Sequence, residues 1–324
     1  MNLLYKYKRY SFISLSLIGL IFIYAFSCTS TATELEEEQT KRDLVVTKTK
    51  EKGGNFDEYW YQGKAEISSY NLTQARYGEL RKGDAILVFV TEPFSKSRQV
   101  KTTPTANNKE DVVSILKLNA IKKFVTGVYD YSILNSVFTP VDIQNQPHSI
   151  KASTSIQEWC GHVYAQLNLQ TYKYKVLLHS YFEQEADREY QVEQALLEDE
   201  LFNRIRINPN TLPTGVVQII PSTTVARLLH HKLSVREAEA IQKNHATNNE
   251  WMTYELSYNS IPERRLSIHY QKEFPHQIEG WEEVYVDDGQ LLTTTANRKK
   301  TILSDYWNQY QLKDEQLRQS LELD

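Results

Sequence analysis

One short stretch of this chain carries three side chains whose types could do chemistry together. Glu158, Cys160 and His162 occupy alternate positions of the sequence. If the stretch is extended, the three side chains share one face, because side chains alternate along a strand. A carboxylate, a thiol and an imidazole on one face could bind a soft divalent metal or form a Cys–His nucleophile pair. These residues are therefore the candidate catalytic or metal-binding residues of the chain.

The same stretch has a simpler interpretation, in which Cys160 has no chemical role. Free cysteines usually behave as small buried hydrophobes, with Trp159 packing in or beside the core and Gly161 marking a bulge. Neighbours two apart on a strand lie about 6.5–7 Å apart, which suits a shared metal but is loose for a direct Cys–His hydrogen bond. Both interpretations stay open, and we predict no cofactor.

Standard catalytic motifs are missing from the sequence. It contains no P-loop, no GxGxxG fingerprint, no HExxH and no GxSxG elbow. The motifs typical of nucleotide, flavin and catalytic zinc enzymes are thus not found. His230 and His231 are adjacent, and adjacent residues rarely ligate one ion. We therefore lean toward a protein that is not an enzyme.

The first residues of the chain follow the order of a bacterial lipoprotein signal. Lys6, Lys8 and Arg9 precede an apolar run over residues 12–26, and Cys28 closes it. The run is shorter than the ~20 apolar residues that a membrane span needs. We predict that residues 1–27 are removed and that Cys28 becomes an acylated membrane anchor. An uncleaved N-terminal anchor is the alternative, and either one places the rest beyond the inner membrane.

Composition limits which classes of partner the predicted mature chain can bind. Residues 28–324 carry 34 Lys and Arg against 41 Asp and Glu, a net charge near −7. An acidic balance argues against nucleic-acid binding, which uses basic patches that face phosphates. The chain has 21 tyrosines, and tyrosine favours strands and boundaries between apolar and wet regions. With Cys28 acylated, Cys160 has no disulfide partner in the chain.

The sequence divides into a tether and a folded part. Residues 28–55 are rich in Thr, Glu and Lys and poor in large apolar side chains, which is typical of a flexible segment. A coil of this length reaches ~30 Å from a membrane. Residues 56–324 form the predicted globular domain, with a candidate internal boundary near residues 205–215, where Pro and Gly mark a long loop.

Most of the domain reads as strands. Residues 161–171 alternate between apolar and polar side chains, which predicts a half-buried strand. Asp287, Asp288 and Gly289 between two apolar runs predict a hairpin. We also expect strands over 64–72, 84–91, 112–118, 124–137 and 174–182, and helices in the second half of 185–205, from the capping box at Ser234 to Asn244, and over 304–321. The expected fold is α+β and mainly antiparallel β, with a large curved or partly closed sheet.

Several sequence blocks together carry a family resemblance. The blocks are Tyr59–Trp60 with Gly63-Lys-Ala-Glu-Ile67, Gln74-Ala-Arg-Tyr-Gly-Glu79, Leu116-Lys-Leu-Asn119, Gln157-Glu-Trp-Cys-Gly-His162, Ile205-Arg-Ile-Asn208 and Leu212-Pro-Thr-Gly215. They resemble a family of lipoproteins from Flavobacteria and other Bacteroidota. Its members often carry the label "septum formation inhibitor Maf", which implies a cytoplasmic nucleotide pyrophosphatase with a Ser-rich, Arg-containing N-terminal loop. This chain lacks such a loop at its folded start. The resemblance supports the envelope location and implies no catalytic residue.

These observations together favour a non-enzymatic binding or scaffold module of the cell envelope. We expect it at the outer membrane, on the periplasmic side or at the cell surface, attached through Cys28. Its expected partners are the membrane and a lipid, a glycan or an envelope protein. The alternative is an enzyme or a metal or redox site built on Glu158, Cys160 and His162.

Overall fold

The computed structural model describes residues 54–259, 261 and 263–323, and within them the chain forms one long, curved and almost entirely antiparallel sheet of sixteen strands. Hairpins join most neighbouring strands. The strands are β1 (Ala65–Arg76), β2 (Glu79–Ser95), β3 (Val100–Lys101), β4 (Val112–Thr126), β5 (Tyr129–Pro140), β6 (Lys151–Glu158), β7 (Gly161–Leu169), β8 (Lys173–Ser180), β9 (Arg188–Glu193), β10 (Leu196–Leu197), β11 (Gly215–Ile220), β12 (Arg236–Asn244), β13 (Trp251–Tyr258), β14 (Arg265–Gln271), β15 (Ile278–Asp287) and β16 (Gln290–Ser304).

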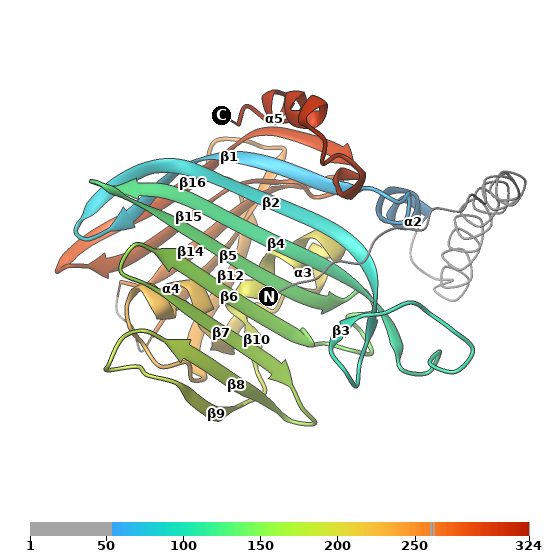
Figure 1. Ribbon diagram of the computed structural model, residues 1–324, viewed down its shortest axis with the longest axis horizontal. Helices are drawn as coiled ribbons and strands as arrows, with labels where there is room; N and C mark the ends of the chain where they lie inside the picture. The colour runs from blue at the N-terminus through green and yellow to red at the C-terminus, as the bar shows by residue number, and fades with distance from the viewer. Residues whose placement is uncertain (1–53, 260, 262, 324) are drawn as a thin grey trace, which may run out of the picture. The chain divides into compact units, whose positions relative to one another are not determined.

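The strand order shows that the sheet curls back toward its own start. It runs from β10 through β11–β16 to β1, β2 and β4–β9, and β3 pairs only with β2. β9 and β10 are therefore the two edges, yet residues 194–195 alone separate them in the chain. Figure 1 shows β1–β9 in front and β12 and β14 behind them. The sheet is thus curved without being closed by pairing between its edges.

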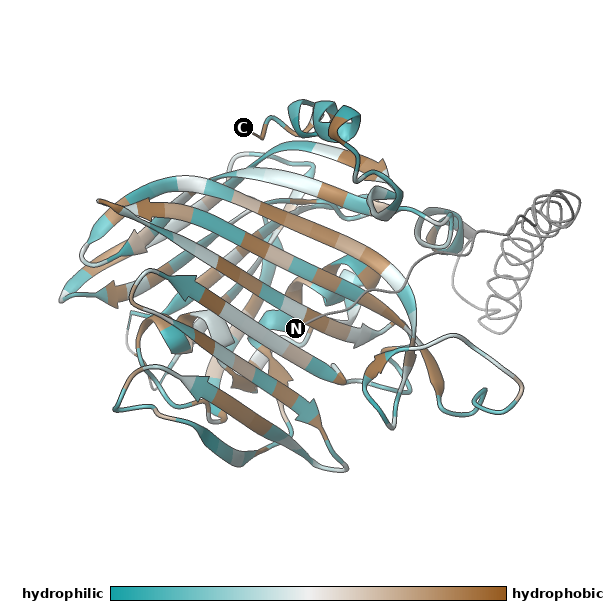
Figure 2. Cartoon of the chain, in the orientation of Figure 1, coloured by the Kyte–Doolittle hydropathy of each residue, from teal (hydrophilic) through white to brown (hydrophobic). Residues whose placement is uncertain are grey.

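Alternation along the strands decides which face of the sheet is buried. Along β7, Val163, Ala165 and Leu167 are buried in the interior, whereas the side chains between them are half-exposed on the outer face. Figure 2 shows the same alternation of hydrophobic and hydrophilic residues along the strands in front. The predicted hairpin is also confirmed, because Asp288 and Gly289 have the positive φ angles, 49° and 74°, that its tight turn needs.

Two short helices lie inside the curl and fill most of it. α3 (Leu201–Ile207) packs against β4 and β5, and α4 (Thr223–Leu228) packs against β5 and β6. Leu201 and Ile205 of α3 are fully buried in the main hydrophobic core, which also contains Trp281 of β15. The interior of the sheet is therefore a packed core.

The expectation of a mainly antiparallel fold with few helices is confirmed, but two local predictions are wrong. Residues 124–137 are not one strand, because the chain turns at Gly127, whose φ is 65°. The segment after Ser234 is strand β12, not a helix. Ala238 and Ala240 are buried there at a spacing of two, and pairing with β11 and β13 outweighs the capping signal.

The remaining helices are shorter than the sequence predicts. Within 185–205, the first part forms β9 and β10, and the helix starts only at Leu201. The C-terminal helix is confirmed as α5 (Gln316–Ser320), after β16 has ended at Ser304. Behind it, Leu321 and Leu323 pack on the outer face of β1 and β2. The chain end thus covers apolar side chains that the curl leaves outside.

The described residues belong to one compact unit, residues 52–324. β9 and β11, on either side of the loop at 205–215, belong to the same sheet. α2 (Gly54–Trp60) lies at the end of the sheet where β1 begins. In the part of the chain that the structure describes, none of the helices has the length and apolar character required to cross a membrane.

Candidate functional site

The structure places a turn where the sequence suggested a continuous strand face. β6 ends at Glu158, and the chain reverses at residues 159–160 before β7 begins. The Glu158 carboxylate accepts a hydrogen bond of 2.7 Å from the Cys160 backbone N–H. His162 lies on the next strand, where its Nε2 is 3.0 Å from Ser155 Oγ. The expectation that Glu158, Cys160 and His162 share one strand face is therefore wrong.

Cys160 is exposed, so its interpretation as a small buried hydrophobe is also wrong. A hydrogen bond to Glu158 and the negative charge of that carboxylate raise the pKa of the thiol. A nucleophilic or metal-binding cysteine needs the opposite, a cation or a helix N-terminus that lowers its pKa. Across the described ranges, no three His, Cys, Asp or Glu side chains are grouped so as to hold a metal ion.

Aromatic side chains lie on both sides of this turn, although Trp159 itself is 70% exposed and does not pack in the core. The Trp159 ring lies 6.4 Å from the Tyr129 ring, measured between centroids, and Tyr129 lies 6.0 Å from Tyr131. On the other side, a Cβ on Gly161 would come within 2.7 Å of the Tyr181 ring, so glycine suits this position. Side chains of the neighbouring hairpins thus flank the turn.

The thiol gives a direct test of the electrostatics of the turn. We expect Glu158→Gln to speed the alkylation of Cys160, because loss of the carboxylate lowers the thiol pKa and raises the thiolate fraction at a given pH. The rate is measured with iodoacetamide and mass spectrometry at several pH values. Glu183→Gln, an exposed carboxylate on the next hairpin, serves as the control. Equal rates in the Glu158 variant and the native chain would disprove the assigned cause.

The other residues singled out in the sequence do not assemble into a site. His230 Nδ1 lies 2.9 Å from Glu185 Oε1, with Arg227 also 3.6 Å from that carboxylate. His231 follows on the turn after α4. Cys28, the predicted lipid anchor, lies outside the described residues.

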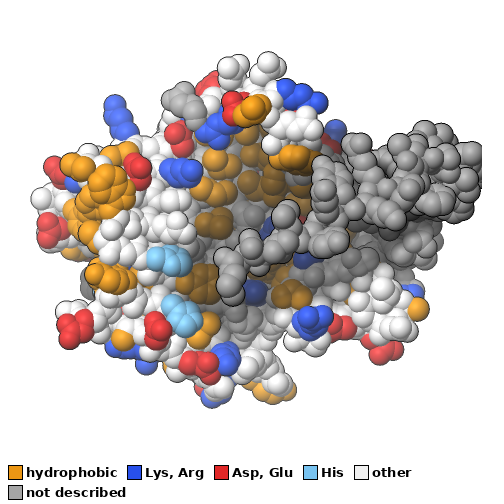
Figure 3. Space-filling view, viewed as in Figure 1, with side chains coloured by type: hydrophobic (Ala, Val, Ile, Leu, Met, Phe, Trp, Pro, Cys, Tyr) orange, Lys and Arg blue, Asp and Glu red, His pale blue; other side chains and the backbone are white. Residues whose placement is uncertain are grey.

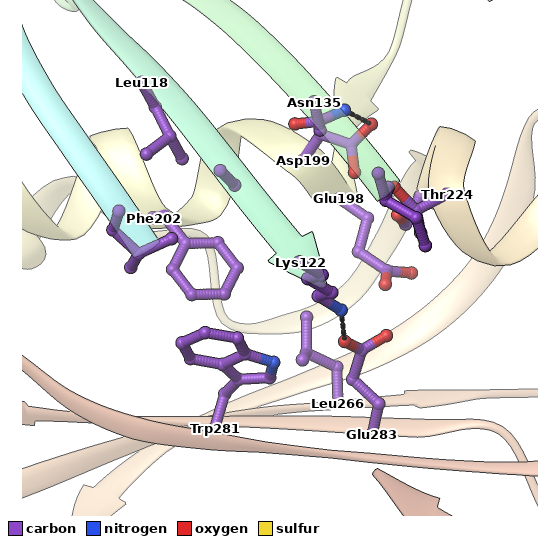
Figure 4. A pocket seen from close by; sticks show the side chains of 14 residues that line it. Leu118, Lys122, Asn135, Glu198, Asp199, Phe202, Thr224, Leu266, Trp281 and Glu283 are labelled. Atoms are coloured by element: carbon purple, nitrogen blue, oxygen red, sulfur yellow. Dashed lines mark hydrogen bonds and ion pairs between the residues drawn. The ribbon is translucent and has the colours of Figure 1, made fainter. Parts of the chain in front are cut away.

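A cavity of about 50 Å³ lies in the interior between the sheet and α3. Figure 4 shows Phe202 of α3 beside Trp281 of β15 at its apolar end, with ring centroids 5.5 Å apart. At the polar end, Lys122 Nζ reaches from β4 to within 2.7 Å of Glu283 Oε1 on β15. A water molecule fills about 30 Å³ of liquid. This cavity therefore has room for one or two waters and none for an acyl chain.

The buried charges around this cavity are paired with one another. Glu198 accepts hydrogen bonds from Arg264 and Tyr258, and Arg264 also lies 3.7 Å from Glu283. Burial raises the pKa of Glu198 even though Arg264 opposes it. Burial also acts to raise the pKa of Glu283, but Lys122 and Arg264 outweigh it and lower the pKa. These interior charges thus compensate one another and stabilise the fold.

A larger groove, with a volume of about 530 Å³, lies on the outer face of the sheet. It runs between the turn at residues 96–99, which joins β2 to β3, and the outward side chains of β7 and β8. Sites for small ligands usually measure ~300–1,000 Å³, so the groove has the right size. Its walls include four side-chain amides, those of Gln99, Gln166, Asn168 and Gln170.

Hydrogen bonds join three of these amides into one row. Gln166 Nε2 donates to Asn168 Oδ1 at 2.5 Å, and Asn168 Nδ2 donates to Gln99 Oε1 at 2.6 Å. The Tyr164 hydroxyl donates to Gln166 Oε1 at 2.6 Å, and Gln99 Nε2 donates to the Leu169 carbonyl oxygen. Each amide has two donors and an acceptor oxygen with two lone pairs. Each amide of the row therefore keeps hydrogen-bonding capacity for a ligand, and the bonds within the row fix how the amides are oriented.

Sequence reasoning placed two side chains of this groove but did not identify the groove. The alternation along β7 correctly placed Gln166 and Asn168 on the outer face. The contribution of Gln99 was missed, because it stands 69 residues before Asn168 in the chain and reaches it only through the turn after β2. The available signal in the sequence was the pair of amide side chains, Gln166 and Asn168, on the polar face of the strand.

Figure 3 shows one face of the molecule, with charged and polar side chains over its lower part and hydrophobic ones at the left end and in the upper middle. The fold and the groove define a class of protein, an open, curved antiparallel sheet with a packed interior and a polar groove outside.

Neither a protein-family model nor a curated protein sequence matches the chain. Among solved structures, the chain is similar to a β-barrel-like protein of domain of unknown function DUF1849 from Brucella abortus. That similarity has a TM-score of 0.46 and 9% identity, and covers 74% of this chain and 98% of the other.

Proposed function

We propose that this chain is a membrane-tethered, non-catalytic module of the cell envelope that binds a glycan in the outer groove. The observation that carries the proposal is the hydrogen-bonded row of Gln166, Asn168 and Gln99. Sugar hydroxyls both donate and accept hydrogen bonds, as amides do, so the row offers matched partners along an oligosaccharide. Because the amides already hold one another, little side-chain entropy is lost on binding.

A glycan fits the groove better than the other expected partners. The interior cavity, at about 50 Å³, is too small for an acyl chain, and the outer groove is lined mainly by polar side chains. The enzyme alternative on Glu158, Cys160 and His162 loses its support, because the turn separates these residues and the thiol pKa is raised. Tethering at the outer membrane, on the periplasmic side or at the surface, rests on the N-terminal sequence ending at Cys28.

The test is a binding assay with defined oligosaccharides. We expect the full-length chain, purified in detergent, to bind at least one of maltotetraose, chitotetraose and tetragalacturonate in isothermal titration calorimetry. Gln166→Ala should weaken that binding about tenfold, because a typical net hydrogen bond contributes ~1 kcal/mol and the row loses its order. Gln218→Ala removes an exposed amide from β11 outside the groove and should bind as the native chain does.

Two results would contradict the proposal. One is the absence of binding for all three oligosaccharides. The other is binding that Gln166→Ala leaves unchanged, since the ligand would then occupy a different surface.

A further inference from the structure

We infer that the outer groove selects a sugar that carries an anionic group, and that Arg98 binds its carboxylate or phosphate. This inference rests on the proposed function, a glycan in the groove, and adds the chemical class of that glycan. It follows from the charges at the groove, from the way the turn that carries Arg98 is held, and from where the groove lies on the sheet.

Positive charge gathers at a groove in a chain whose formal net charge is −4. The groove is lined by Lys96, Arg98 and Lys175 against a single carboxylate, Glu189. Lys175 Nζ lies 2.9 Å from Glu189 Oε1, so these two charges compensate each other. Lys96 interacts electrostatically with Asp111 behind the turn.

Arg98 is the cation beside the amide row, because it immediately precedes Gln99 in the turn. It is exposed, and no carboxylate of residues 54–259, 261 or 263–323 forms an ion pair with it. A guanidinium presents parallel N–H donors that match the two oxygens of a carboxylate or phosphate. Arg98 therefore supplies what the amide row lacks, a partner for negative charge.

Hydrogen bonds hold the turn that carries Arg98 in a defined conformation. The Arg98 backbone N–H donates to Ser95 Oγ at 3.0 Å, and the Ser97 N–H donates to Asp111 Oδ1 at 2.8 Å. Gln99 holds a φ of 53°, which is uncommon for a residue other than glycine, and its N–H donates to the Ser95 carbonyl oxygen at 2.8 Å. Such conformations persist where surrounding contacts enforce them, often at binding sites. Arg98 and the amide row are thus held on one rigid frame, joined through Gln99.

The groove also lies at the end of the sheet where the chain enters from its predicted anchor. β1 begins at Ala65 beside the last residues of β2, because Glu66 pairs with Phe89, and the turn at 96–99 follows that end of β2. Figure 1 shows α2 and β3 at this same end. A groove near the attachment of a membrane tether is placed to meet the sugar of a membrane glycolipid as well as a soluble acidic glycan.

The first test compares two oligosaccharides of equal length by calorimetry on the full-length chain in detergent. We expect tetragalacturonate to bind at least about tenfold more tightly than maltotetraose, because charge-assisted hydrogen bonds are about twice as strong as neutral ones. Arg98→Gln should abolish this preference by lowering the affinity for tetragalacturonate to about that for maltotetraose. Arg188→Gln, which changes an exposed arginine on β9 outside the groove, should keep the preference. Added salt should weaken tetragalacturonate binding alone.

Competition then distinguishes the two sources of an acidic sugar. Micelles doped with lipid A, a phosphorylated glucosamine disaccharide, should displace tetragalacturonate if a glycolipid head group is the ligand. If they do not displace it, a soluble acidic glycan is the ligand. Displacement by micelles doped with phosphatidylglycerol, an anion without a sugar, would overturn the inference.

The failure of this inference can be told apart from failure of the proposed function. Equal affinity for the two oligosaccharides, unchanged in Arg98→Gln, would overturn the anionic selection and keep a glycan-binding groove. Absence of binding for both would remove both proposals together.

Discussion

Replacing Arg264 with Met should lower the free energy of unfolding by about 3–5 kcal/mol at neutral pH, the usual cost of removing one partner of a buried ion pair. Arg264 is 3% exposed, and its guanidinium is shared between Glu198 and Glu283. Without it, Glu198 keeps a hydrogen bond from the Tyr258 hydroxyl but no cation, whereas Glu283 keeps Lys122 among the described residues. The variant therefore buries one uncompensated carboxylate.

The loss in this variant should depend on pH. Burial already raises the pKa of Glu198 in the native fold, and removal of the cation raises it further. A carboxyl whose pKa is higher in the folded than in the unfolded state binds more protons when folded, so stability falls as the pH rises through that window. The stability contributed by protonation is complete below the ordinary Glu pKa and is lost above the raised one. The Arg264 variant should thus be closer to the native chain in mildly acidic buffer than at neutral pH.

Urea unfolding followed by tryptophan fluorescence at two pH values measures this effect. Arg265→Met, which changes the exposed neighbour, should shift the free energy of unfolding by less than about 0.5 kcal/mol. A destabilisation of the Arg264 variant that is the same at both pH values would show that lost packing, not the unpaired carboxylate, is its cause.

The second large effect is expected at the ion pair between Arg206 of α3 and Glu66 of β1. Both side chains are fully buried, and the Arg206 guanidinium also lies 5.1 Å from the ring centroid of Trp60 and 5.2 Å from that of Phe89. Arg206→Met should cost about 3–5 kcal/mol, because it leaves Glu66 with the Tyr59 hydroxyl as its remaining polar partner.

A double variant separates the charge from the packing. Glu66→Gln combined with Arg206→Met leaves no uncompensated charge, so we expect the pair to be less destabilised than Arg206→Met alone. Both are measured by urea unfolding of the full-length chain, with Arg236→Met on the exposed side of β12 as the control. The opposite result would be a double variant whose free energy of unfolding lies below that of Arg206→Met by the full effect of Glu66→Gln. The two substitutions would then act independently, and the ion pair would not be the source of the effect.

These ion pairs illustrate what sequence reasoning could not find. Glu66 and Arg206 are 140 residues apart, and Glu198 and Arg264 are 66 apart. Their charges read as surface features in the sequence, since charged residues are rarely buried unless paired. The curl of the sheet around α3 is what brings each pair together. The same long-range placement overturned the helix expected after Ser234, because neighbouring strands supplied pairing that a local capping signal does not describe.

Local patterns were most informative where neighbours in the chain decide the structure. The alternation along β7 and the turn at Asp288–Gly289 depend on period-two side-chain placement and on residues that accept positive φ. By contrast, the stretch from Glu158 to His162 was misread, because a two-residue turn interrupts a pattern that is otherwise compatible with a continuous strand.

The sequence by itself determined that this is a mainly antiparallel β protein with few helices, and it supplied the predicted lipid anchor at Cys28, because composition, periodicity and turn residues act over short distances. Only the tertiary structure decided that Glu158, Cys160 and His162 do not share one strand face, and that Gln99 and Arg98 meet Gln166 and Asn168 at one groove. The physical reason is that strand register and the packing of distant segments follow from burial of the whole chain, which no local pattern contains.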